Sequence, residues 1–459
     1  MTTQAGRSEL AGYVTDVPYV YGFKPMLAPA WLDLVAIIGG VAPPARERGF
    51  AWCDLGCGQG VTAAILAATH PTGSFYGVDA MPAHIDHATR LAAEADASNA
   101  QFHVAEFGVR SLPMPRFDYI VAHGVYSWVD RPVRAQLRRL IDGHLKSGGL
   151  VYVSYNALPG WTGDLPFQHL ARELAADLPG DSAKRFAGAA TLLGKLADAG
   201  APSLASSYVA GELRTRPADY RPGYLVHEFM HAGWQPLYVT EVRRDLKEIG
   251  LVPVGSALLM ENFDGWVLGR QARALVAGIT DPDRRELVRD FCMHQRFRCD
   301  VFARDAAPLA PAEQRDRLLT AGLALARPPA AITYEVPTPA GRVRYDNAAS
   351  RAIIASLMSG IGRLADIPSG FAPERDLIAN MLALCSAGDV RPAEKTRTPV
   401  GPLNRALQRR MGKAEEIPVV ALPCGTALDI DHDLLGLLRG DAGDRASADW
   451  REFLAMHGV

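Results

Sequence analysis

The sequence predicts an α/β fold in which a parallel sheet is covered by helices on both faces. Short apolar stretches alternate with helical segments of about 10–15 residues between Phe50 and Asn156, and this alternation is typical of parallel sheets. A glycine-rich loop, DLGCGQG at residues 54–60, also follows the first predicted strand and precedes the first predicted helix. A glycine loop at that junction is typical of α/β proteins that bind nucleosides.

The elements follow one another in a regular order. Strands are predicted at 50–57, 74–80, 101–106, 117–124 and 150–156, and helices at 61–70, 83–97 and 132–146. The third helix has apolar residues at helical spacing and ends before Ser147-Gly148-Gly149. A further helix at 240–250 and a strand at 251–259 follow. Phe297, Cys299 and Val301 alternate with charged residues, which favours an antiparallel edge strand at 296–303, with 265–268 as the competing segment.

Four regions are predicted along the chain. Residues 1–165 hold an N-terminal segment and the ligand-binding core, 166–235 a helical insertion, and 236–305 the completion of the sheet. Residues 306–459 form a smaller, mainly α recognition or assembly domain. Its extended pieces at 331–339 and 341–346 flank a turn, and a winged-helix-like arrangement fits them.

Composition excludes several classes of protein. The 459 residues are 48% hydrophobic and carry a net charge of −2, which argues against disorder and against a nucleic-acid partner. No apolar run reaches the roughly 18 residues of a membrane helix, and the N-terminus lacks the pattern of a signal peptide. Six scattered cysteines fit reduced thiols. We therefore expect a cytoplasmic protein without a membrane partner.

The glycine loop and two acidic residues predict a nucleoside site. Gly56, Gly58 and Gly60 have the spacing G-x-G-x-G, which differs from the G-x-G-x-x-G of dinucleotide enzymes. Asp79 ends the second strand about 20 residues later, where a carboxylate can accept hydrogen bonds from both ribose hydroxyls. Glu106 ends the third strand, within reach of an adenine amino group.

This pattern resembles the class I S-adenosylmethionine-dependent methyltransferases over residues 31–161. The resemblance implies a Rossmann-like sheet of seven strands, the last one antiparallel, and S-adenosylmethionine as the cofactor. It further implies that the three glycines surround the methionine and ribose, that Asp79 binds the ribose, and that Glu106 or Phe107 lies near the adenine. Asp54 would hold the loop and approach the methionine amino group.

A second resemblance is more specific. Several segments are similar to a bacterial methyltransferase family with a regulatory domain, which includes the rickettsial outer-membrane-protein lysine methyltransferases: YVTDVPY (13–19), FDYIVAHGVYSWVD (117–130), GGLVYVSYNALPGW (148–161), YLVHEFMHAGWQPLYVTEV (224–242) and QRFRCDVFAR (295–304). The resemblance implies methyl transfer, with a protein lysine as one acceptor. A small-molecule N- or O-methyltransferase is the alternative, and a non-catalytic cofactor-binding regulator is a third.

Catalytic candidates lie in the loops after the fourth and fifth strands, at the edge where ligands bind in open α/β sheets. His123, Tyr126 and Tyr155 are the predicted catalytic residues, and His123 is also a predicted cofactor contact. Trp128 and Trp161 offer aromatic faces to a sulfonium or an amine. The insertion is expected to cover the acceptor pocket and to contribute to a homodimer interface.

One motif suggests a competing activity. His227-Glu228-Phe229-Met230-His231 matches the H-E-x-x-H pattern of zinc proteases. The longer pattern with a third histidine does not follow, and Pro236 soon ends the helix. We therefore expect no metal site.

Overall fold

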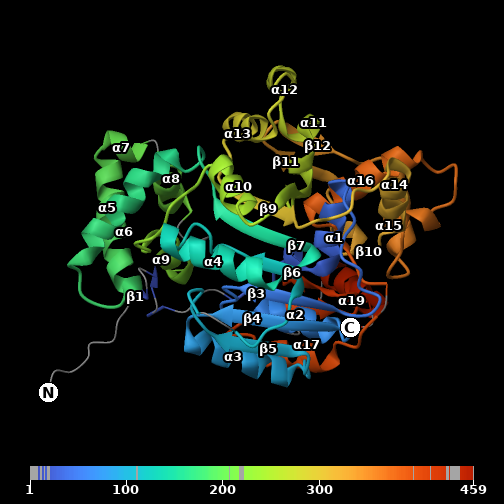
Figure 1. The fold of residues 1–459 in the computed structure, drawn as a ribbon, viewed down its shortest axis with the longest axis horizontal. Helices are drawn as coiled ribbons and strands as arrows, with labels where there is room; N and C mark the ends of the chain where they lie inside the picture. The colour runs from blue at the N-terminus through green and yellow to red at the C-terminus, as the bar shows by residue number, and fades with distance from the viewer. Residues whose placement is uncertain are drawn as a thin grey trace.

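Seven strands form a single sheet in the order β5-β4-β3-β6-β7-β9-β8 (Figure 1). The structure is a computed structural model that describes residues 9–10, 13–14, 16–17, 21–109, 112–205, 207–216, 222–395, 397–413, 415–430, 434, 445–457 and 459. The strands of the sheet are β3 (Phe50–Leu55), β4 (Gly73–Asp79), β5 (Ala100–Val104), β6 (Phe117–Ala122), β7 (Leu145–Asn156), β8 (Val252–Ser256) and β9 (Phe297–Ala303). The predicted seven-stranded sheet is confirmed. Thr15, Pro18 and Tyr19 of the N-terminal motif lie outside the described residues.

The position of the antiparallel strand differs from the prediction. β3 to β7 pair in parallel, whereas β9 pairs antiparallel with both β7 and β8. β9 is thus an interior strand and β8 is the edge. The charged residues of β9 led to the prediction of an exposed edge strand. In the structure, however, Arg298 and Asp300 are buried because they pair with each other, and Arg298 also pairs with Asp290. Residues 264–267 form the short helix α11 (Asp264–Val267) and no strand.

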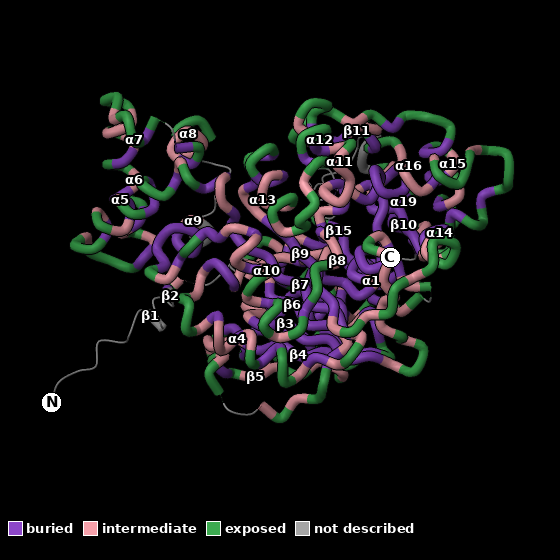
Figure 2. Tube along the Cα trace, turned by 45° about the horizontal axis from the view of Figure 1, so that its top comes forward, coloured by how far each residue is buried: buried purple, intermediate pink, exposed green. Residues whose placement is uncertain are grey.

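Helices cover both faces of the sheet. α1 (Pro29–Ile38), α2 (Val61–Thr69) and α3 (Pro82–Glu94) pack on one face, and α4 (Arg131–His144) and α10 (Val239–Lys247) on the other. Neighbouring residues of β3 divide accordingly, since Trp52 belongs to the first hydrophobic cluster and Cys53 to the second. This alternation follows from the pleat of the strand. The central strands β3 and β6 are almost entirely buried, in purple in Figure 2, whereas the edge strands β5 and β8 are more exposed.

The segment between β7 and α10 is helical. It contains α5 (Leu165–Ala176), α6 (Ser182–Asp198), α7 (Pro202–Ala205), α8 (Tyr208–Thr215) and α9 (Pro222–Phe229), at the left of Figure 1. These helices share a hydrophobic cluster of their own, which includes Phe167, Phe186 and Phe229. The same cluster contains Val14 of the N-terminal hairpin, β1 (Glu9–Leu10) and β2 (Tyr13–Val14). α12 (Arg270–Ala277) and α13 (Pro282–Met293) lie between β8 and β9 in sequence.

The C-terminal region adds helices and three small two-stranded sheets. Its elements are α14 (Pro311–Thr320), β10 (Leu323–Leu325), β11 (Glu335–Thr338), β12 (Gly341–Arg344), α15 (Ala348–Leu357), α16 (Glu374–Ala387), β13 (Val390–Pro392), α17 (Gly401–Gln408), β14 (Val419–Leu422), β15 (Thr426–Asp429) and α19 (Arg445–His457). The predicted hairpin is present, because β11 pairs antiparallel with β12.

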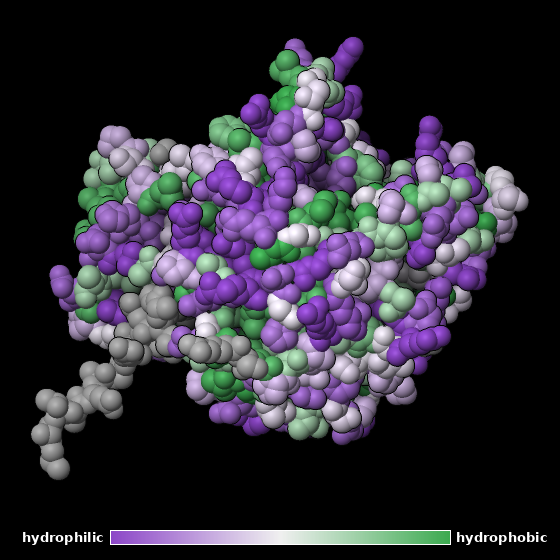
Figure 3. All heavy atoms as spheres, in the orientation of Figure 1, coloured by the Kyte–Doolittle hydropathy of each residue, from purple (hydrophilic) through white to green (hydrophobic). Residues whose placement is uncertain are grey.

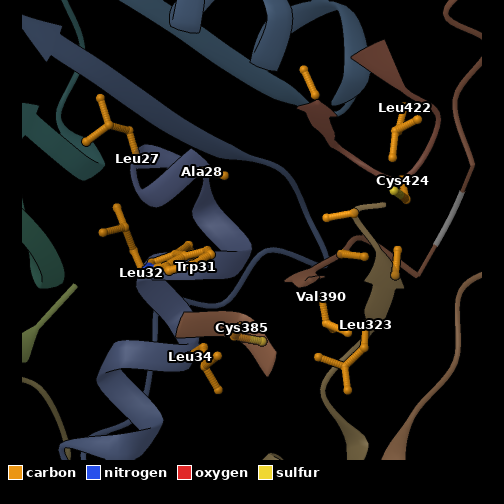
Figure 4. Packing of buried hydrophobic residues seen from close by; sticks show 14 of the residues in the cluster. Leu27, Ala28, Trp31, Leu32, Leu34, Leu323, Cys385, Val390, Leu422 and Cys424 are labelled. Atoms are coloured by element: carbon orange, nitrogen blue, oxygen red, sulfur yellow. The ribbon is translucent and has the colours of Figure 1, made fainter. Parts of the chain in front are cut away.

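The C-terminal region shares its hydrophobic core with the sheet domain. Trp31, Leu32 and Leu34 of α1 belong to the same cluster as Leu323, Val390 and Leu422, and Figure 4 shows the two groups in one packed region. Ion pairs join the two parts as well. Glu394 pairs with Arg46, and Arg410 pairs with Glu94 of α3; Nε2 of His70 also lies 3.2 Å from Oε1 of Glu394. Residues of the C-terminal region therefore pack against α1 and α2, and they also contact α3.

No helix in the described part of the chain is long and apolar enough to cross a membrane. On the face drawn in Figure 3, hydrophilic residues cover the region of α4 and α10, with smaller hydrophobic patches between them.

Candidate functional site

A pocket opens at the carboxyl edge of the sheet, beside the ends of β3, β4, β5 and β6. Two adjoining cavities form it, and they share Gly56, Gly58 and His123. The larger is lined by Gly56, Gly58, Asp79, Ala80, Met81, Ala105, Glu106, Phe107, His123, Val125, Trp128, Val129, Val133 and Gln136. The smaller is lined by Tyr21, Gly22, Lys24, Leu27, Asp54, Gly56, Cys57, Gly58, Gln59, Val61, Thr62 and His123. The residues predicted from the glycine loop thus meet in one place.

The glycine loop needs its glycines for conformation and for space. Gly56 has φ +88°, and a Cβ there would lie 2.4 Å from Cγ2 of Val125. Gly60 precedes α2 with φ +68°, and its Cβ would lie 2.3 Å from the Cβ of Ala88. Residues that carry a side chain rarely adopt a positive φ, and neither position has room for a Cβ. The loop can therefore hold its backbone close to a ligand.

Asp79 holds the loop from the end of β4. Its Oδ2 accepts a hydrogen bond from the backbone N–H of Gly58 at 2.9 Å, and its Oδ1 accepts one from Met81 at 2.9 Å. Nδ1 of His84 lies 3.2 Å from Oδ1. The carboxylate lines the larger cavity and has lone pairs to spare, as a ribose site requires.

Asp54 is a buried carboxyl group with an unsatisfied oxygen. It lies in β3 and is only 5% exposed, and no described residue bonds its Oδ1. Burial, with the charge of Asp79 as the second cause, raises the pKa of Asp54 to about 8. Because an unpartnered buried polar atom is costly, this oxygen is suited to a cationic ligand group in the smaller cavity.

Glu106 and Phe107 follow β5 and line the larger cavity. Trp128, in the loop after β6, adds an aromatic wall to the same cavity. Trp161 does not line either cavity, because its indole packs within the helical insertion and the Arg296 guanidinium lies 4.3 Å above its ring. One of the two predicted tryptophans therefore reaches the pocket.

His123 follows β6 and lines both cavities. Its Nδ1 lies 2.9 Å from the Tyr152 hydroxyl and 3.1 Å from the Ser154 hydroxyl, so two residues of β7 orient the ring. Burial lowers the pKa of His123 to about 3, and the positive charge of Lys24 adds to this effect. The imidazole is therefore neutral at physiological pH and a weak base.

The structure does not bring Tyr126 and Tyr155 to the pocket. Both side chains are fully buried. The Tyr126 hydroxyl donates to Oδ2 of Asp245 at 2.9 Å, and the Tyr155 hydroxyl donates to Oδ2 of Asp300 at 2.7 Å. Neither residue lines either cavity, because the pleat of β7 turns Tyr155 to the opposite face from Tyr152 and the Tyr126 ring packs toward α10. The predicted catalytic role for these phenols thus has no counterpart in the pocket.

The H-E-x-x-H motif serves contacts between segments. Helix α9 ends at Phe229, so His231 lies beyond it. Nε2 of His227 lies 2.8 Å from the carbonyl oxygen of Val17, and Nδ1 of His231 accepts from the Val14 amide at 3.1 Å. Glu228 accepts from Nδ2 of Asn156 at 2.7 Å. Among the described residues, no group of three or more His, Cys, Asp or Glu side chains is placed to hold a metal ion.

Sequence reasoning missed the residues of the N-terminal segment. Tyr21 and Lys24 line the smaller cavity, although they precede the sheet and belong to no motif that we could name. Gln59 and Thr62 line the same cavity and were not predicted either, although they lie in and just after the glycine loop. Gln136 lies on the first half of α4, and nothing in its surroundings in the sequence marks it.

Comparisons with known proteins agree with this geometry. A methyltransferase domain model matches residues 53–151, and a model described as a predicted methyltransferase regulatory domain matches residues 221–304. An uncharacterized protein of Synechocystis is 32% identical over 350 residues, which are 76% of this chain and 69% of that protein. An uncharacterized protein of Rickettsia prowazekii is 31% identical over 159 residues, 35% of this chain and 62% of that protein.

Among solved structures, PKMT2 from Rickettsia typhi in complex with AdoHcy has a similar fold. The TM-score is 0.68 at 20% sequence identity, over 92% of this chain and 88% of that chain. The pocket fits the corresponding cofactor, S-adenosylmethionine, since the loop leaves no room for side chains and Asp54 offers an unsatisfied oxygen. Sheet order, glycine loop and sequence relatives lead to one assignment: the chain belongs to the class I S-adenosylmethionine-dependent methyltransferases that carry a methyltransferase regulatory domain.

Proposed function

We propose that this enzyme transfers the methyl group of S-adenosylmethionine to a lysine side chain of a protein. The observation that carries the acceptor class is the extent of the likeness to PKMT2, which covers the helical insertion and the C-terminal region as well as the sheet domain. The resemblance of the chain's segments to lysine methyltransferases supports the same acceptor. The proposal also assigns roles to the residues of the pocket.

In this proposal the larger cavity holds the adenosine and the smaller cavity holds the methionine. Asp79 accepts from the ribose hydroxyls, while Glu106 and Phe107 lie at the adenine. Support comes from their shared cavity and from the two backbone amides that already fix the Asp79 carboxylate. Asp54 faces the methionine end, where its unsatisfied Oδ1 lies.

The bound cofactor supplies an electrophilic methyl group, and the chain supplies position and shielding from water. Trp128 and His123 border the cavity from the loop after β6, and the Trp128 ring lies 5.4 Å from that of His231 beyond α9. Aromatic faces attract cations. A neutral His123 adds no repulsion to a sulfonium or an approaching amine. The insertion thus flanks the side from which we expect the acceptor to enter.

The acceptor class is tested by methyl incorporation from labelled cofactor. Cell extract of the source organism, freed of nucleotides, is incubated with the wild-type enzyme or with Asp79→Ala and divided into protein and small-molecule fractions. We expect label in protein with the wild type only, and mass spectrometry should find mono-, di- or trimethyllysine in the labelled bands. Label confined to small molecules would overturn the lysine assignment and support a small-molecule N- or O-methyltransferase.

A further inference from the structure

The smaller cavity contains an acidic and a basic side chain that do not pair with each other. Asp54 presents its buried, unsatisfied Oδ1 from β3. Lys24 lines the same cavity from the N-terminal segment, and no described carboxylate lies within ion-pair distance of its ammonium. Lys24 and His123 line this cavity together, and the charge of Lys24 contributes to the lowered pKa of that imidazole.

The backbone around Lys24 is fixed against the sheet domain. The Lys24 amide donates to Oγ1 of Thr62 at 3.1 Å, in the first turn of α2. Three residues later, the carbonyl oxygen of Leu27 accepts from the indole Nε1 of Trp52 at 3.0 Å. These bonds hold the segment over the cavity, so the position of Lys24 does not depend on a free loop.

The same cavity also receives the beginning of α2. Gly60 is the N-cap residue, and Val61 and Thr62 of the first turn line the cavity. Backbone N–H groups of a first turn lack helical partners and favour an anion. Lys24 and this helix end therefore form a positive side, and Asp54 forms an acidic side that becomes negative when it faces an ammonium group. A ligand group that carries both an anion and a cation, as an amino acid does, is complementary to this arrangement.

We propose that Lys24 binds the α-carboxylate of the cofactor's methionine moiety, opposite the α-ammonium group that the family resemblance assigns to Asp54. This inference rests on the proposed orientation of the cofactor and adds Lys24 as a determinant of affinity. Because the adenosine occupies the other cavity, Lys24 should contribute to the affinity only for ligands that have the carboxylate.

The test compares two ligands by isothermal titration calorimetry. S-adenosylhomocysteine carries the amino-acid group, and 5′-methylthioadenosine has the same nucleoside without it. Lys24→Met should weaken the affinity for S-adenosylhomocysteine roughly 10- to 100-fold, which corresponds to the loss of one hydrogen bond to a charged group. Its affinity for methylthioadenosine should stay within about twofold of the wild type. Lys24→Arg, which keeps the charge, should recover most of the loss.

Controls separate this inference from the proposed function. Lys195→Met changes an exposed lysine of α6 and should alter neither affinity. Thermal melting without ligand verifies that the Lys24 variants fold, and Lys24→Gln is the substitute if Lys24→Met does not. Equal losses for both ligands, or no loss for either, would overturn the role of Lys24. Failure of the wild type to bind either ligand, or an Asp79→Ala variant that binds both normally, would instead overturn the proposed cofactor orientation.

Discussion

Replacing Asp79 by alanine is expected to weaken cofactor binding much more than it weakens the fold. In the free protein the carboxylate bonds the amides of Gly58 and Met81 and lies 3.2 Å from Nδ1 of His84. Water reaches both amides through the pocket once the carboxylate is gone. We therefore expect a loss of about 1–3 kcal/mol in the free energy of unfolding.

The effect on binding should be larger. Two ribose hydroxyls lose a charged acceptor, which corresponds to about 2–4 kcal/mol, or roughly a 30- to 1,000-fold weaker affinity. Calorimetry with S-adenosylhomocysteine measures this loss, and urea unfolding measures the stability of the same samples. Asp86→Ala, at an exposed position of α3, is the matched control. If Asp79→Ala and Asp86→Ala bind the ligand equally well, the assignment of Asp79 to the ribose is wrong.

Three further perturbations test other parts of the structure. Asp54 should be protonated in the free protein below its pKa of about 8 and ionised when it faces an ammonium group. Between about pH 6 and 7.5, cofactor binding should therefore release a proton, and the affinity should rise up to tenfold per pH unit. Calorimetry in buffers of different ionisation enthalpy measures this release, and an equal release in Asp54→Asn would contradict it. Gly60→Ala should lower the free energy of unfolding by about 2–4 kcal/mol, because its φ is +68° and its Cβ would meet Ala88. The control is Gly194→Ala on α6, where a Cβ meets no other atom, and it should raise the free energy of unfolding by about 0.4–1 kcal/mol in the same urea titration. Similar changes in the two variants would refute the steric argument. A protein ending at Arg304 should aggregate and lose its affinity for S-adenosylhomocysteine, since α1 and α2 would expose their outer apolar surfaces; a soluble fragment with a cooperative thermal transition and unchanged affinity would show that the sheet domain folds alone.

The sequence was sufficient for the parallel half of the sheet and for the glycine loop. Strands β3, β4 and β6 are buried on both faces, so their apolar runs are continuous and easily recognised. The position of β9 was predicted wrongly because its sequence is not a continuous apolar run. It is interior but contains Arg298 and Asp300, whose charges are satisfied by each other and by Asp290. An ion pair formed in the interior has no signature along the chain.

Only those site residues that lie at the ends of predicted strands could be predicted from the sequence. Asp54, Asp79 and Glu106 end or follow strands whose carboxyl ends meet at one edge, so their convergence follows from topology. Tyr155 lies near the same edge, but a shift of one residue along a strand reverses the face of the sheet. Lys24 reaches the pocket because its amide donates to Thr62 and the Leu27 carbonyl accepts from Trp52, two contacts that only the folded chain brings together.

The core that joins the two ends of the chain has a consequence for synthesis on the ribosome. Roughly 390 residues separate α1 from β15, whose residues lie in the same cluster. At about 5–20 residues per second, translation needs roughly 20–80 s to deliver the second part after the first has emerged. During this interval the nascent chain displays Leu32, Leu34 and their neighbours without their final partners. We therefore expect the growing polypeptide to require a chaperone until β15 has left the exit tunnel.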